Sequence, residues 1–221
     1  MKLLPAILTD SMTIFTEQLE IAKQGEQVDT VHIDVVDGMF ADTLTLTPLD
    51  LAVVDFGELQ VDFHLMTEEP MDFVHECEAV REYLPIRRII GQIERMSSQR
   101  DFVAEVKRNG WQPALGLDIF TPIDSIDEDV WGEFPAILIM GIEAGAQNKV
   151  FNPHALEKIQ ELRQKYPNLE QLNIGIDGGV KIENLKQILE TGVDEVMVGS
   201  AIWKSDQPVQ LIDQLHEVAG Q

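Results

Sequence analysis

Eight times along this chain, a short run of apolar or β-branched residues is followed by a longer segment with the pattern of a helix. The predicted strands are Leu3–Leu8, Thr30–Val35, Leu59–Leu65, Ile86–Ile93, Pro113–Ile119, Ala136–Ile142, Leu172–Ile176 and Glu195–Val198. The predicted helices are Met12–Gln24, Leu46–Val54, Met71–Arg81, Ser97–Asn109, Pro122–Val130, Pro153–Tyr166, Ile182–Thr191 and Val209–Val218.

This alternation predicts the fold class. Because a helix follows each strand, consecutive strands are expected to run parallel through right-handed crossovers. Eight such units in 221 residues predict a closed (β/α)8 barrel that forms one domain over residues 1–221. An open doubly wound sheet is the alternative, but no Gly-x-Gly-x-x-Gly dinucleotide fingerprint follows the first strand.

The charge of the chain bears on its partners. The formal net charge is −23, which repels nucleic-acid phosphates and anionic lipid, so we expect neither nucleic acid nor membrane as a partner. A phosphorylated ligand would need local cations or backbone amides.

The single cysteine, Cys77, excludes an intrachain disulfide, and residues 1–8 are too short and too weakly basic for a signal peptide. No apolar run has the length of a membrane span. These features favour a cytoplasmic protein.

Four metal-binding side chains stand at the ends of three predicted strands. His32 and Asp34 are two residues apart on one strand, so they point to the same side. His64 ends the next strand, and Asp177 ends the seventh. Since active sites of such barrels lie at the carboxyl ends of the strands, the four are expected to converge there. Two imidazoles and two carboxylates suit one divalent ion: zinc, iron(II), manganese or cobalt.

Taken singly, each residue also has an ordinary structural explanation. A histidine on a strand is commonly a satisfied core residue, and Asp177 before two glycines is typical of a turn. The remaining histidines lie on predicted helices and are interpreted as surface residues: His75, His154 and His216. The prediction of a site therefore depends on the coincidence of four residues.

The motifs resemble those of the ribulose-phosphate 3-epimerase family over nearly the whole chain. The matching segments are Pro5-Ala6-Ile7-Leu8, His32-Ile33-Asp34-Val35-Val36-Asp37-Gly38, Leu44-Thr45-Leu46-Thr47-Pro48, His64-Leu65-Met66, Asp177-Gly178-Gly179 and Gly199-Ser200-Ala201-Ile202. The resemblance implies that His32, His64, Asp34 and Asp177 hold the metal. It also implies that the two aspartates exchange a proton at C3 of a ketose phosphate through an enediolate.

The resemblance further implies a substrate-binding set and a homo-oligomer. The implied substrate-binding and phosphate-binding residues are Ala6, Met66, Met140, Gly145, Gly178, Gly179, Gly199 and Ser200. For the two methionines, core packing is an equally good explanation. The glycines would let the backbone approach a phosphate closely, and amide donors need no net charge.

The chain also departs from the family pattern. Ala6 replaces a serine, Val36 replaces a methionine and Gln92 replaces a histidine of the fourth strand. The loop after the sixth strand is Glu143–Lys149 in place of a glycine-rich segment. The charge of Glu143 would oppose a nearby phosphate, and Lys149 either compensates or lies on the surface. Three hypotheses stay open. They are an epimerase of D-ribulose 5-phosphate, a related epimerase or isomerase of another keto sugar or hexulose phosphate, and a silent metal-containing barrel that binds a ligand or partner.

Overall fold

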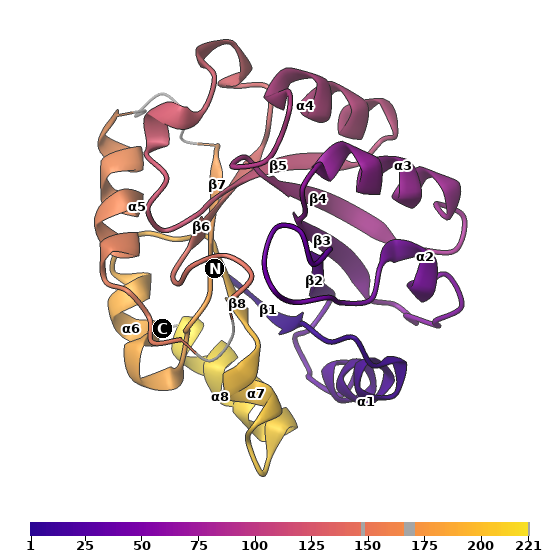
Figure 1. The fold of residues 1–221 in the computed structure, drawn as a ribbon. Helices are drawn as coiled ribbons and strands as arrows, with labels where there is room; N and C mark the ends of the chain where they lie inside the picture. Colours follow the sequence, from indigo (N-terminus) through magenta and orange to yellow (C-terminus); the bar gives the residue numbers. More distant parts are fainter. Residues whose placement is uncertain (147–148, 166–170, 221) are drawn as a thin grey trace.

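A computed structural model describes residues 1–146, 149–165 and 171–220. The strands are β1 (Lys2–Ile7), β2 (Thr30–Val36), β3 (Gln60–Met66), β4 (Ile86–Gln92), β5 (Gln112–Leu117), β6 (Ala136–Met140), β7 (Asn173–Asp177) and β8 (Glu195–Val198). Each pairs in parallel with the next, and β8 pairs with β1 to close the barrel. The predicted fold class is confirmed, and the open sheet is excluded. Figure 1 shows the strands at the centre and the helices around them.

The helices are α1 (Met12–Ala22), α2 (Pro48–Leu51), α3 (Pro70–Ala79), α4 (Gln99–Arg108), α5 (His154–Lys165), α6 (Ile182–Leu189), α7 (Ser200–Trp203) and α8 (Pro208–Ala219). The predicted helix Pro122–Val130 is wrong, because the structure has two 3-10 turns there, Ile123–Ser125 and Glu128–Val130. The aspartates and the serine of this segment favour turns. The short helix α7 was not predicted, and Tyr166, the predicted end of a helix, lies outside the described residues.

The strands are buried on both faces, as expected for a parallel barrel. Leu3 and Ile7 of β1 belong to the core between strands and helices. Leu4 and Ala6 alternate with them and belong to a separate core inside the barrel. The inner core continues with Val36, Met66, Ile90, Ala114, Ala136, Leu138, Met140 and Met197. The interior is therefore filled, which leaves the ends of the barrel as the places for polar chemistry.

Charged side chains fill the amino-terminal end of the barrel. Asp62 near the start of β3 and Glu195 at the start of β8 are buried. Arg87 donates from Nε to Asp62 Oδ1 at 2.8 Å, and from Nη1 to Glu195 Oε1 at 3.3 Å. Arg88 also pairs with Glu195. This ionic layer closes the bottom of the barrel with paired charges and leaves the carboxyl end for the site.

The prediction that His216 is a surface residue is also wrong. The residue is 8% exposed, and its Nδ1 lies 3.0 Å from the carbonyl oxygen of Ile212. Its position one residue after the buried Leu215 and four after Ile212 places it on the inner side of α8. His75 and His154 are exposed, as predicted. Within the described residues, no helix is long and apolar enough to cross a membrane.

Candidate active site

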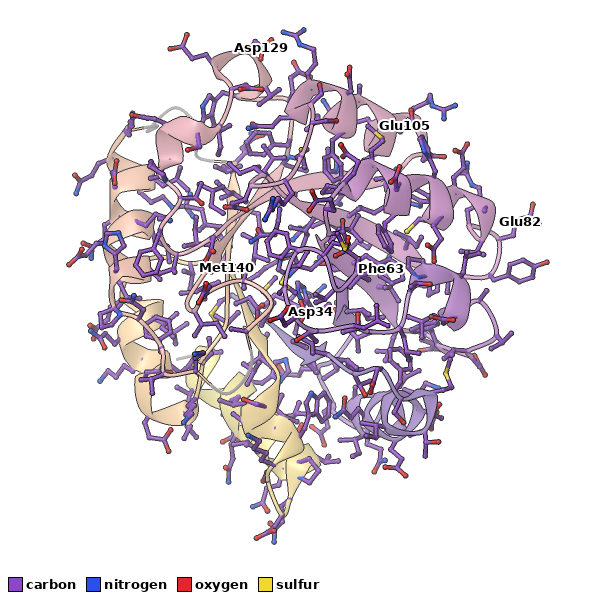
Figure 2. All side chains as sticks on the ribbon, viewed as in Figure 1. Asp34, Phe63, Glu82, Glu105, Asp129 and Met140 are labelled. Carbon is purple, nitrogen blue, oxygen red and sulfur yellow. The ribbon has the colours of Figure 1, made fainter. Side chains whose placement is uncertain are left out.

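A cavity of about 220 Å³ lies at the carboxyl ends of the strands. Figure 2 labels Asp34 and Met140 near the centre of the molecule, whereas Glu82, Glu105 and Asp129 lie toward its outer edge. Ten of the twelve residues singled out from the sequence line this cavity: Ala6, Asp34, Met66, Met140, Gly145, Asp177, Gly178, Gly179, Gly199 and Ser200. The other two, His32 and His64, are fully buried.

Strand register brings the four candidate metal-binding side chains together. In the β2–β3 pairing, Asp34 lies opposite His64, and Asp177 ends β7 beside β6. Ligand atoms of His32, Asp34, His64 and Asp177 all lie within 4.8 Å of one another. His32 Nε2 is 3.2 Å from Asp34 Oδ1, and His64 Nδ1 is 2.9 Å from the same oxygen. The cluster therefore has one carboxylate oxygen between two imidazole nitrogens.

The two carboxyl groups have pKa values displaced in opposite directions. Burial alone would raise the pKa of Asp34, but the charges and hydrogen bonds of His32 and His64 outweigh it and hold the pKa well below its ordinary value. Burial, reinforced by the charge of Asp34, raises the pKa of Asp177 to about 6. Burial opposes the charged form of His32, but the charge and hydrogen bond of Asp34, together with the charges of Asp177 and Asp62, outweigh burial and raise the pKa of His32. Divergent carboxyl pKa values in one cavity are a feature of acid–base sites.

The arrangement suits a divalent cation. Two imidazoles and two carboxylates are a common donor set for zinc, iron(II), manganese and cobalt. The nitrogens that face the cluster, His32 Nε2 and His64 Nδ1, converge on Asp34 Oδ1. The opposite nitrogens, His32 Nδ1 and His64 Nε2, have no hydrogen-bond partner among the described residues. A cation among the inner atoms would use their lone pairs, so the residues fit a metal.

Two residues outside the predicted site hold the end of β2 in place. Thr45 Oγ1 accepts from the Val36 amide at 2.9 Å and donates to the Asp34 carbonyl at 3.1 Å. Asp37 Oδ2 accepts from the Glu68 amide at 2.6 Å, which ties the loop after β2 to the loop after β3. Both residues stand in the quoted motifs, but their hydrogen bonds depend on tertiary contacts that spacing does not encode.

Close backbone approaches mark the opposite side of the cavity. Gly178 and Gly179 have φ values of +101° and +70°, a conformation that disfavours side chains. A Cβ on Gly179 would lie 2.8 Å from backbone atoms of Phe151, and one on Gly199 would lie 3.1 Å from the Ala6 carbonyl oxygen. Trp203, which the sequence did not single out, lines the cavity and donates from Nε1 to that carbonyl at 2.6 Å.

The loop after β6 is tied to neighbouring strands. The Ala144 amide donates to Asp118 Oδ1 at 3.2 Å, and the Gly145 amide lies 3.0 Å from Met66 Sδ. Glu143 is exposed and does not line the cavity. Lys149 and Lys204 do line it. Residues 147–148 of this loop lie outside the described residues.

Comparison with known sequences identifies relatives over nearly the full chain. A profile described as the ribulose-phosphate 3 epimerase family matches residues 2–203. The chain is 27% identical to a ribulose-phosphate 3-epimerase, cytoplasmic isoform, of Oryza sativa, with 98% of this chain and 93% of the relative covered. It is 28% identical to a ribulose-phosphate 3-epimerase of Methanocaldococcus jannaschii, covering 97% and 89%. The Bacillus subtilis ribulose-phosphate 3-epimerase is 27% identical, with 97% of each chain covered.

Solved structures agree on the fold. A 3-hexulose-6-phosphate synthase from Salmonella typhimurium superposes with a TM-score of 0.66 at 14% identity, covering 99% of this chain and 98% of that one. A phosphoribosyl anthranilate isomerase from Thermus thermophilus superposes with a TM-score of 0.63 at 11% identity, covering 100% and 98%. At these identities the likeness concerns the barrel alone.

Proposed function

The chain belongs to the ribulose-phosphate 3-epimerase family and is an isomerase that acts on a carbohydrate, and we propose that it interconverts D-ribulose 5-phosphate and D-xylulose 5-phosphate. The observation that carries this proposal is the pair of carboxylates, Asp34 and Asp177, that line one cavity beside two buried histidines. Inversion at a carbon requires a proton to leave one face and another to arrive on the opposite face. Two carboxyl groups on different strands, Asp34 on β2 and Asp177 on β7, would serve as the two proton-transfer groups.

Asp34 and Asp177 take the proton-transfer roles in the proposal. Asp34, with its lowered pKa, is ionised and accepts the C3 proton. Asp177, with its raised pKa, carries a proton in part of the molecules near pH 6 and delivers it to the other face. The roles exchange in the reverse reaction, as an epimerase that works in both directions requires. A divalent cation held by His32, His64 and the two aspartates would stabilise the negative charge that develops on the enediolate oxygens.

The phosphate is proposed to bind at the amides of Gly178, Gly179, Gly199 and Ser200. Three of these positions are glycines that line the cavity, and a glycine lets its backbone amide approach an anion closely. Lys149 and Lys204 line the same cavity and would supply positive charge that amides lack. Met66 and Met140, with Ala6 and Gly145, would surround the sugar.

The altered loop favours one alternative, an epimerase of a different ketose phosphate. Of the glycine-rich family loop only one glycine, Gly145, is kept, and Ala6 lacks the serine hydroxyl. These changes affect the walls of the cavity and leave the two carboxylates in place. A silent barrel is disfavoured, because the family membership comes with all four metal-binding side chains in one cluster.

The test is a coupled assay for D-xylulose 5-phosphate formed from D-ribulose 5-phosphate by the metal-reconstituted protein. Turnover above about 1 per second is expected. Asp34→Asn and Asp177→Asn should each abolish net epimerisation. Each should still exchange the C3 hydrogen of one epimer with solvent deuterium, a different epimer for each variant. Absence of turnover by the parent would exclude this substrate, and exchange of the same epimer by both variants would exclude the assigned proton transfers.

A further inference from the structure

A buried glutamine lies next to the metal-binding cluster. Gln92, the last residue of β4, is fully buried, and neither its side-chain oxygen nor its nitrogen has a hydrogen-bond partner among the described residues. Leaving two amide atoms unsatisfied is unfavourable, and an apolar side chain of similar size would avoid the cost. A residue that weakens the fold in this way is a candidate for a functional role.

His64 has the complementary unpaired atom. Its Nδ1 faces Asp34 Oδ1 at 2.9 Å, whereas its Nε2 is buried without a partner among the described residues. In a neutral imidazole one nitrogen carries hydrogen and the other carries the lone pair that binds a metal. For Nδ1 to serve as the ligand, the hydrogen must be on Nε2, and a buried N–H needs an acceptor.

Gly116 of β5 shows that the two unpaired groups border one small space. Gly116 is the register partner of Gln92 in the β4–β5 pairing. A Cβ on Gly116 would overlap the side-chain oxygen of Gln92 and would lie 3.5 Å from His64 Nε2. The absence of a side chain at Gly116 therefore leaves room for the glutamine oxygen on the side of His64 that faces away from Asp34.

We propose that Gln92 is a positioning residue for the metal ligand His64. With a cation bound, its side-chain oxygen would accept the hydrogen of His64 Nε2, a bond that neither atom makes in the present structure, and this bond would fix the tautomer and keep the lone pair of Nδ1 directed at the cation. This inference rests on the proposed function only in that both use a divalent cation at the four-residue cluster. The role is that of an outer partner, since Gln92 is not among the residues that line the cavity.

The test compares two glutamine-to-leucine variants in the full chain. Gln92→Leu removes the acceptor from His64. Gln99→Leu is the matched control, since Gln99 is also buried but bonds to the Ser125 carbonyl and the Asp127 amide outside the site. The measurements are the dissociation constant for Co²⁺, from competition with a chromophoric chelator, and the visible absorption spectrum of the Co²⁺ protein. Thermal unfolding in excess chelator reports stability without metal.

The two variants are expected to lose different properties: Gln92→Leu loses metal affinity, and Gln99→Leu loses stability. Gln92→Leu should weaken Co²⁺ binding about 10-fold to 100-fold and alter the spectrum, with an unfolding temperature in chelator equal to or above that of the parent. Gln99→Leu should unfold at a lower temperature and bind Co²⁺ like the parent. Gln92→Glu, which keeps an oxygen acceptor, should recover most of the affinity and the parent spectrum.

Several results would overturn the inference. Co²⁺ affinity of Gln92→Leu within threefold of the parent, with an unchanged spectrum, would do so, and so would equal losses in Gln92→Leu and Gln92→Glu. Binding is measured without substrate, so a parent that binds Co²⁺ but does not epimerise D-ribulose 5-phosphate refutes the proposed reaction alone. A parent that epimerises normally while Gln92→Leu keeps full affinity refutes the positioning role alone.

Discussion

Replacing Asp177 by asparagine is expected to stabilise the metal-free protein at neutral pH, although it removes a proposed proton donor. Burial and the neighbouring charge of Asp34 raise the pKa of Asp177 from its ordinary 3.8 to about 6. The folded protein therefore favours the neutral carboxyl, and ionisation opposes folding. At about 1.4 kcal/mol per pH unit, the penalty above pH 6 is about 3 kcal/mol.

The sign of this effect follows from proton linkage. Because the folded pKa of Asp177 exceeds the unfolded one, the folded state binds the proton more tightly between pH 4 and 6. The stabilising contribution is fully present below about pH 4 and is lost as the pH rises through 6. Asparagine is neutral throughout and nearly the same shape. The difference between variant and parent should thus be about 0.5 kcal/mol at pH 4 and about 3 kcal/mol at pH 7.5.

Urea unfolding in chelator at several pH values measures this difference, and calorimetry should show a rise of about 6–12 °C in the unfolding temperature at pH 7.5. Asp10→Asn, at an exposed aspartate, controls for the loss of one charge from a chain of net charge −23 and should change the free energy of unfolding by less than about 0.5 kcal/mol. An equal gain for Asp177→Asn at pH 4 and pH 7.5 would refute the titration argument. So would a variant that is no more stable than the parent at pH 7.5.

Three further outcomes are expected. Removal of divalent metal by chelation should abolish turnover, and adding back Co²⁺ or Zn²⁺ should restore it, as followed in the coupled assay. Lys149→Gln should raise KM for D-ribulose 5-phosphate about tenfold with little change in kcat, whereas Lys186→Gln, an exposed lysine outside the cavity, should leave both unchanged. Glu195→Ala should cost about 3–5 kcal/mol in urea unfolding, because Arg88 would stay buried without its main partner; a loss below about 1 kcal/mol would contradict this.

The sequence was sufficient for the barrel because its strands carry a strong local pattern. Each is a short apolar run, buried on both faces and separated from the next by helix signals, so the order and parallel direction of the strands follow with little ambiguity. The prediction of a helix over Pro122–Val130 was wrong for a local reason. Buried Ile123, Ile126 and Val130 resemble a helical spacing, but the short polar residues between them favour turns.

The candidate site was predictable where chemistry and strand position coincide. His32 and Asp34 are two residues apart on one strand, and the strand order of a barrel places His64 beside them. Trp203, which ends the short helix α7, and Lys204, which follows it, were missed because the sequence pattern does not reveal this helix. Glu143 was expected to oppose a phosphate, yet it is exposed and does not line the cavity. The direction of a loop side chain depends on tertiary contacts, which the local sequence pattern does not predict.

The tertiary contacts of the loop after β6 also explain how the cavity wall can differ from the family pattern while the metal-binding cluster stays the same. The loop after β6 is held by Asp118 from the end of β5 and by Met66 from the end of β3. Asp34 is held from another direction, through the hydroxyl of Thr45 and the pairing of β2 with β3. Both sets of contacts use β3, but the loop meets only the side chain of Met66 there, whereas Asp34 depends on the backbone pairing of the two strands, so we expect a glycine-rich segment to be replaceable without moving the metal-binding cluster. Under the proposed function, we therefore expect variation in the loop to affect the choice of sugar phosphate, and variation at the strand ends to affect the proton transfer itself.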